Sequence, residues 1–571
     1  MHRLCAIVHS EVTACTSVLV RAQFHYLYSL ASECMTGEGD MTTYDDDVAA
    51  VNFDHNDDSV VVIIGSGAGG GTVAHELSEK GISVVVIEAG PRLKLTDFVN
   101  DEYDAYDMFT WTDKRTSTGN GEIARKWADS PSWVCKLVGG STVHWAGLAL
   151  RWNDEEFRAR STYGEVPGTS VTNWPLNLSD LEPYYAKAED KMGVTGTNGI
   201  PHLPETNNFK ILNLGARRLG YEKVNTSYMA INSEPRDGRN ACDQIGFCMA
   251  GCRSGAKWST LYSEIPKAEA TGNMELRANS MALRVEHDPS GKVTGVVYVD
   301  EDGNQQLQKA RVVVVACNAI ESSRILLNSA SNVYPDGLSN SSGMVGKNWT
   351  RHMTGYAYGI FDKPVNYHRG TNASGLVQDE WHHDDDRGFA GGYLMGTISL
   401  GLPYYAAFLR PGGWGREFSQ DVEAYNFVSG IFINGEDMPI ESNAITLHDT
   451  ERDQFGMPVP NINVDDHPND VAMRNHSLKR SSEILLAAGA KRVLECPPMP
   501  GSHNMGTCRM SDSESDGVVN KWGQSHDIPN LFIADGSIFS TAGGCNPTLT
   551  IVTLAIREAE YIAEQMRTST I

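Results

Sequence analysis

Three cysteines stand close together in the stretch NACDQIGFCMAGC, where Cys242, Cys248 and Cys252 follow a C-x5-C-x3-C spacing. A disulfide would use two of them and leave one over. Structural zinc sites take four nitrogen or sulfur ligands, often in CxxC pairs, and a c-type haem needs CxxCH; neither pattern occurs here. Iron–sulfur clusters are held by thiolates on closely spaced loops, and three thiolates suit a [3Fe–4S] cluster. The spacing therefore favours a cluster, with buried structural thiols as the alternative.

A glycine-rich turn gives a second chemical signal. Gly65, Gly67 and Gly70 form G-x-G-x-x-G, and Glu88 follows eighteen residues after Gly70. The first glycine permits the turn, the second lets the backbone approach a pyrophosphate, and the third lets a helix pack closely. An acid at this distance accepts a hydrogen bond from a ribose hydroxyl. The pattern predicts a dinucleotide site but does not distinguish FAD from NAD.

The elements that must position these residues can be read from the same stretch. An apolar run at 60–64 predicts a buried parallel strand, followed by the turn, a helix over 72–80 and a second strand over 83–87. Alternating segments with glycine turns over 274–303 predict a strand meander. The segment 310–331 reads as a second strand–turn–helix unit. The predicted fold class is therefore α/β.

Five separated blocks of the sequence, in the order in which they occur along the chain, resemble those of the glucose–methanol–choline family of FAD oxidoreductases. The resemblance covers about residues 59–571 and implies a Rossmann-like FAD-binding domain interleaved with an α+β substrate-binding domain. The implied FAD-binding domain takes residues 59–170, 258–350 and 497–571; the substrate domain takes 171–257 and 351–496, with the iron–sulfur loop at 242–252; residues 1–58 form an N-terminal extension, read as disordered or as a mis-assigned start.

The resemblance also implies catalytic residues. In GSHNMGTCRM, His503 matches the family's catalytic histidine, and in GGCNPTLT, Asn546 matches its second catalytic position. We expect His503 to take the hydroxyl proton of an alcohol and Asn546 to donate a hydrogen bond to it, while flavin N5 accepts the hydride.

Further positions match the family's flavin contacts. The sequence departs from many members at Cys317 and Asn318, where alanine and glycine are common, and this turn is expected to be less tight. His144 stands where several members have asparagine. The positions expected to contact FAD are the turn Gly139, Gly140, Ser141, Thr142 and His144; the pyrophosphate segment Asp535 and Gly536; and the helix start Asn546, Pro547 and Thr548.

The cysteine spacing resembles, more narrowly, the catalytic subunits of bacterial membrane-linked sugar dehydrogenases, of the glucoside 3-dehydrogenase, gluconate, fructose or FAD-glucose dehydrogenase type. That resemblance implies a [3Fe–4S] cluster on Cys242, Cys248 and Cys252, a cytochrome c acceptor and a small subunit that carries an export signal. The expected reaction is oxidation of a secondary alcohol of a sugar or glycoside, with C3 of glucosides favoured. The chain has no apparent export signal of its own, so its sequence predicts a cytoplasmic protein unless a partner carries it to the periplasm.

The formal net charge of −25 over 571 residues argues against nucleic-acid binding, because such a surface cannot neutralise phosphates. No apolar run reaches the length of a transmembrane helix. Two alternative functions remain open. One is an alcohol oxidase or dehydrogenase that uses O2 or a quinone directly, and the other is a flavin-retaining electron-transfer subunit without substrate turnover.

Overall fold

The computed structural model describes residues 51–109, 113–127 and 132–571. Most of the predicted extension, 1–50, therefore lies outside the described residues. Its last residues already belong to the fold, because Phe53 N–H donates to Glu275 and His55 stacks on Tyr298. None of the helices in these described segments has the length and apolar content to cross a membrane.

The glycine-rich turn belongs to a five-stranded sheet with the order β17-β9-β1-β2-β5. Every strand pair in it is parallel. The strands are near-continuous valine and isoleucine runs, as expected where both faces of a parallel sheet are covered. The predicted Rossmann-like α/β arrangement is confirmed. The strands are β1 Val61–Ile64, β2 Val84–Ile87, β5 Met274–Arg277, β9 Val312–Val315 and β17 Leu531–Ile533.

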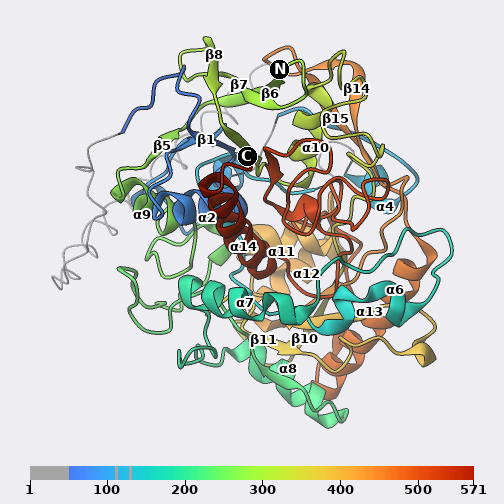
Figure 1. Ribbon diagram of the computed structural model, residues 1–571. Helices are drawn as coiled ribbons and strands as arrows, with labels where there is room; N and C mark the ends of the chain where they lie inside the picture. The colour runs from blue at the N-terminus through green and yellow to red at the C-terminus, as the bar shows by residue number, and fades with distance from the viewer. Residues whose placement is uncertain (1–50, 110–112, 128–131) are drawn as a thin grey trace, which may run out of the picture. The chain divides into compact units, whose positions relative to one another are not determined.

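Two helices pack together beside this sheet. Figure 1 shows α14 (Thr548–Arg567, dark red) next to α2 (Ala68–Ser78, blue). The helix α2 begins at Ala68, four residues before the predicted start at Thr72. Gly69, Gly70 and Gly71 have low helix propensity, so the sequence signal begins after them, but close packing keeps them helical.

The predicted meander and second strand–turn–helix unit are also present. The strands β6 (Met281–His287), β7 (Val293–Val299) and β8 (Gln305–Lys309) form an antiparallel three-stranded sheet. Helix α10 (Ala319–Asn328) follows β9, and Asn318 caps it by accepting from the N–H groups of its first turn. Asn318 has φ 85°, so this asparagine keeps the left-handed turn that glycine usually makes.

A six-stranded antiparallel sheet has the order β16-β10-β13-β12-β11-β4. Helices α8 (Asn207–Arg218) and α13 (Pro468–Ala488) pack on each other and on this sheet. This is the α+β part of the fold. Its strands are β4 Val224–Thr226, β10 Met353–Ile360, β11 Gly375–Val377, β12 Tyr393–Thr397, β13 Val428–Gly435 and β16 Arg492–Glu495.

The other elements connect or flank these sheets. A second three-stranded sheet has the order β14-β15-β3. The remaining bounds are β3 Thr116–Thr118, β14 Ile445–Arg452, β15 Pro458–Asn463, α3 Glu102–Phe109, α4 Glu122–Lys126, α5 Asp154–Phe157, α6 Ala159–Tyr163, α7 Leu178–Met192, α9 Glu264–Ala270, α11 Leu402–Leu409 and α12 Arg416–Glu423, with short 3-10 turns η1 Leu95–Asp97, η2 Gly140–Thr142, η3 Cys248–Ala250, η4 Asp385–Arg387, η5 Ala424–Phe427 and η6 Gly536–Ile538.

The glycines at the start of α2 differ in what surrounds them. A Cβ on Gly69 would lie 1.6 Å from the Ala534 carbonyl oxygen, and one on Gly70 would lie 2.0 Å from that of Gly65. A Cβ on Gly67 would approach only the Gly140 Cα, at 4.0 Å. Gly69 and Gly70 therefore allow neighbouring backbone segments to pack closely, whereas the space beside Gly67 is open.

We expect Gly69→Ala to lower stability by about 1–3 kcal/mol or more, because backbone must move to admit the methyl group. Gly67→Ala, two residues away, should change stability by less than about 1 kcal/mol. Thermal unfolding of the two cofactor-free variants beside wild type measures the difference, and equal losses would contradict the packing argument.

Candidate active site

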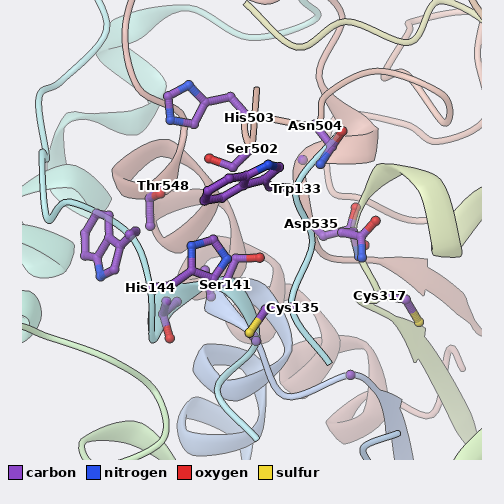
Figure 2. Close-up of a pocket in the computed structure, with 18 of the residues that line it drawn as sticks. Trp133, Cys135, Ser141, His144, Cys317, Ser502, His503, Asn504, Asp535 and Thr548 are labelled. Atoms are coloured by element: carbon purple, nitrogen blue, oxygen red, sulfur yellow. The ribbon is translucent and has the colours of Figure 1, made fainter. Parts of the chain in front are cut away.

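A cavity of about 290 Å³ connects the glycine-rich turn to the two predicted catalytic residues. Figure 2 shows Ser141, His144, His503, Asp535 and Thr548 among the side chains that line it. Gly70 and Gly139 do not line it. The predicted residues that do are Gly65, Gly67, Glu88, Gly140, Ser141, Thr142, His144, His503, Asp535, Gly536, Asn546, Pro547 and Thr548.

The floor of this cavity is made by two glycine turns in contact. Gly139 and Gly140 both have positive φ, and a Cβ on Gly140 would lie 3.1 Å from the Gly67 Cα. Gly139 N–H donates to Ser66 Oγ at 3.0 Å. Bare backbone on both turns leaves room for a ligand group to approach closely, which fits a dinucleotide pyrophosphate.

Glu88 is buried at the end of β2 and faces the cavity. Its Oε2 accepts from Ser66 Oγ at 2.7 Å, and its Oε1 accepts from Gly90 N–H at 3.0 Å. Burial raises the pKa of Glu88, although these hydrogen bonds oppose the rise. The carboxyl group is thus held in place by the turn that it follows, at the position predicted for a ribose contact.

Asp535 ties the end of β17 to the start of α10. Its Oδ2 accepts from Asn318 N–H at 3.0 Å and from Ser322 Oγ at 2.5 Å, and its Oδ1 accepts from Ser537 N–H at 2.7 Å. The unusual pair Cys317 and Asn318 also lines the cavity. The turn at Cys317 and Asn318, which the sequence predicts to be less tight, is therefore held in place by the buried carboxyl group of Asp535.

The N-terminus of α14 opens onto the cavity through Pro547 and Thr548. The first N–H groups of a helix have no partner within the helix, and the helix dipole places positive potential there. This end of α14 can stabilise negative charge on a bound ligand.

His503 and Asn546 contact each other, and a third residue completes the arrangement. Asn546 Nδ2 lies 3.2 Å from His503 Nε2, and His503 Nδ1 lies 2.9 Å from His352 Nδ1. His352 Nε2 lies 3.1 Å from the Ala542 carbonyl oxygen. His352 directly precedes β10 and has φ 66°. No motif in the sequence marks it, and only the folded chain brings it to His503.

This network assigns the protons on both rings. A carbonyl oxygen only accepts, so His352 Nε2 carries hydrogen and Nδ1 of the neutral ring accepts. His503 must then donate from Nδ1, which leaves the lone pair on Nε2. Asn546 donates to that lone pair, and Asn434 Nδ2, at 3.5 Å from Asn546 Oδ1, favours this orientation of the amide. His503 Nε2 is therefore the atom that can take a proton.

The electrostatic environment keeps the histidines neutral. Burial lowers the pKa of His503 well below its usual 6.5, and His352 lowers it further. Burial lowers the pKa of His352 to about 4. The pKa of His144 falls to about 4 because of burial and the nearby charge of Lys257. A neutral His503 at pH 7 is the form that acts as a general base.

The three cysteines border a second cavity of about 30 Å³. All three have free thiols. Burial raises the pKa of Cys242 to about 12, and Cys248 and Cys252 contribute to the rise because they lie close enough to repel a thiolate. The loop is tightly turned, since Gln244 and Phe247 both have φ 59°.

Among the described residues, no three histidine, cysteine or acidic side chains are arranged to hold a single metal ion. A cluster has a different requirement, because each thiolate binds a different iron and the sulfurs stand farther apart. The buried hydroxyl of Thr371, which also borders the small cavity, has no hydrogen-bond partner among the residues that the structure describes. The site has the donors for a cluster but not the geometry for one ion.

The two cavities share a thin wall. Cys248 and Thr371 line the small cavity, while the next residue in each case, Met249 and Asn372, lines the large one. In each segment, consecutive residues therefore line the small cavity and the large cavity.

The neutral histidines make a pH prediction. Below pH about 6.5 the unfolded chain binds a proton at His503 that the folded protein does not. The free energy of unfolding therefore decreases as the pH is lowered, by up to about 1.4 kcal/mol per pH unit. His503→Gln should remove this loss, and its stability relative to wild type should rise between pH 6.5 and 5.5. His382→Gln, whose side chain is 44% exposed, is the control. Denaturant unfolding at the two pH values measures the change, and a His503→Gln curve parallel to wild type would contradict it.

The sequence matches known proteins over nearly all of its described length. Residues 114–354 and 439–555 match the family described as GMC oxidoreductase, and residues 63–105 match an NAD(P)-binding Rossmann-like domain. The 2-methyl-1,2-propanediol dehydrogenase of Mycolicibacterium austroafricanum is 32% identical, over 89% of this chain and 96% of the relative. The fructose dehydrogenase large subunit of Gluconobacter japonicus is 28% identical, over 89% and 98%.

Solved structures share the fold at lower identity. A formate oxidase variant from Aspergillus oryzae, studied for its FAD modification, superposes with a TM-score of 0.66 at 16% identity, over 90% of this chain and 99% of that one. The family supports FAD as the cofactor, and the glycine-lined floor of the cavity fits the pyrophosphate of a dinucleotide. The chain belongs to the GMC oxidoreductase family and is an FAD-dependent oxidoreductase that acts on CH–OH donors.

Proposed function

We propose that this protein is a dehydrogenase that oxidises a secondary alcohol of a sugar or glycoside to a ketone and passes the electrons through a [3Fe–4S] cluster to a cytochrome c partner. C3 of a glucoside is the favoured position, on the sequence resemblance alone. The observation that carries the proposal is the thin wall between the cavity of His503 and that of the three cysteines.

His503 acts as the base in this proposal. Its Nε2 has the lone pair and takes the proton of the substrate hydroxyl, while Nδ1 stays protonated and donates to His352. Asn546 donates to the oxygen that loses the proton, since its Nδ2 already points to the same nitrogen. FAD, when bound, supplies the acceptor for the hydride.

The walls of the large cavity suit a polyhydroxylated substrate. Trp133, Tyr356 and Phe408 provide aromatic surface, and Asn372 and Asn434 provide amides. Aromatic rings pack against the C–H faces of sugars, while amides hydrogen-bond their hydroxyl groups. This supports a sugar or glycoside over a simple alcohol.

The cysteine loop supports a partner-linked dehydrogenase. A cluster on Cys242, Cys248 and Cys252 would carry single electrons away from a two-electron cofactor. An enzyme that reduces O2 directly has no use for such a relay. The fructose dehydrogenase relative is named as a large subunit, which favours a multi-subunit assembly here. The small export-signal-bearing subunit and the periplasmic location are proposed on the sequence resemblance alone.

The alternative is an oxidase or dehydrogenase that passes electrons to O2 or a quinone directly, with the three cysteines as structural thiols. The formate oxidase neighbour shares the fold and is an oxidase. Both kinds of enzyme stop turning over without an acceptor, so anaerobic arrest does not distinguish them. The rate of peroxide formation in air identifies the form that reduces O2.

Replacement of the base is expected to stop turnover without loss of FAD. His503→Ala should lower kcat by about 10²–10⁴-fold, because general-base catalysis contributes that much. Flavin absorbance of the purified variant should match wild type. His382→Ala, on a half-exposed ring, should leave both unchanged. Near-normal kcat in His503→Ala on a glycoside panel would contradict the assignment.

The cluster is tested by iron content and EPR spectra of anaerobically purified protein. Wild type should contain three irons per chain and give a three-iron signal when oxidised, and Cys248→Ser should lose both. Cys496→Ser removes another buried thiol that borders neither cavity and should keep them. Iron-free wild type would favour the oxidase.

A further inference from the structure

Lys257 is a buried lysine between the two cavities. Only 1% of its surface is exposed, and it lines the small cavity with the three cysteines. Its backbone N–H donates to Cys252 Sγ at 3.4 Å. Its ammonium group donates to the carbonyl oxygens of Val143 at 2.9 Å, Trp145 at 2.6 Å and Cys248 at 2.5 Å.

Those three carbonyls show which form of the side chain is present. An ammonium group has three N–H donors, and each of them has one acceptor here. The three acceptors come from two places: Val143 and Trp145 flank His144 on the turn that lines the large cavity, and Cys248 belongs to the cysteine loop. One buried cation thus joins both sites.

The cation has no carboxylate partner among the described residues. The nearby groups that could carry an opposing charge are the thiols of Cys248, Cys252 and Cys135, which are neutral unless they lose a proton. Lys191, also largely buried, is different, because it pairs with Glu76 at 3.2 Å and Glu264 at 2.8 Å. Buried charges are costly unless they are paired with an opposite charge. An anionic group in the adjoining cavity would supply the opposite charge that the ammonium group of Lys257 lacks among the described residues.

We propose that Lys257 is the counter-charge of the anionic iron–sulfur group on Cys242, Cys248 and Cys252, and that it raises the reduction potential of that group. This inference rests on the cluster of the proposed function. Each added electron increases negative charge beside the ammonium group, so the reduced form gains more from it than the oxidised form. A fixed cation here would draw electrons out of the histidine cavity and into the cysteine loop.

A purely structural role makes a different prediction. If the side chain only ties the cysteine loop to the turn at 143–145, a neutral donor should replace it without a change in potential. Lys257→Met removes charge and donors, Lys257→Gln removes charge but keeps donors, and Lys257→Arg keeps both. Lys191→Met removes a buried lysine that borders neither cavity and is the matched control.

The experiment is an anaerobic potentiometric titration of each purified holoenzyme, followed by EPR for the cluster and by absorbance for the flavin, with iron measured per chain. We expect Lys257→Met and Lys257→Gln to lower the cluster midpoint by at least the equivalent of a tenfold change in its redox equilibrium, about 59 mV for one electron. Lys257→Arg and Lys191→Met should stay near wild type.

The outcomes separate the two hypotheses. Iron-loaded Lys257→Gln with an unchanged midpoint would overturn the counter-charge while the cluster stands. Iron-free wild type would overturn the cluster and the counter-charge together. If Lys257→Met does not fold, the midpoint of Lys257→Gln alone distinguishes the two roles. If Lys257→Met and Lys257→Gln lose iron while Lys257→Arg retains it, the result supports the need for a positive charge at this position.

Discussion

The contact between two bare backbone turns is the constraint on which the rest of this protein depends. A Cβ on Gly140 would lie only 3.1 Å from the Gly67 Cα, so Gly140 cannot carry a side chain without moving the turn at Gly67. One turn continues into α2 and the other leads to Val143 and Trp145, which accept from Lys257. The floor of the FAD cavity therefore also fixes the position of the cysteine loop. A local steric requirement for cofactor binding becomes a long-range restraint on a second site.

The chemistry of the large cavity depends on residues from two kinds of sheet. His503 and Asn546 lie near β17 and α14, which belong with the parallel sheet. His352 directly precedes β10, and Asn434 lies in β13 of the antiparallel sheet. The proton positions on His503 are set by residues from the antiparallel sheet, although His503 itself lies beside the parallel sheet. The proposed active site is therefore complete only when both sheets hold their residues in place.

Much of this arrangement could be predicted from sequence, and the exceptions have physical causes. The strands around Gly65 and the helix after Pro547 carry strong local signals, since valine runs and glycine or proline positions act within a few residues. His352 could not be found, because its role comes from a contact across 151 residues and from an unusual backbone angle. Lys257 was equally hidden, since a lysine in sequence suggests a solvated surface. The start of α2 was placed late because glycine packing overrides propensity. The domain limits and the cluster remain predictions.

The thin wall at Cys248–Met249 and Thr371–Asn372 has a consequence for how such a protein can diversify. In the proposed function, residues that line the substrate space are covalent neighbours of residues that line the cluster site. A change at Met249 or Asn372 that moves the backbone would be transmitted directly to Cys248 or Thr371. Substrate range and acceptor choice are therefore not independent traits in this scaffold. Directed evolution toward a new alcohol should recover compensating changes on the far side of the wall, and lineages that lose the relay should be freer to change what they oxidise.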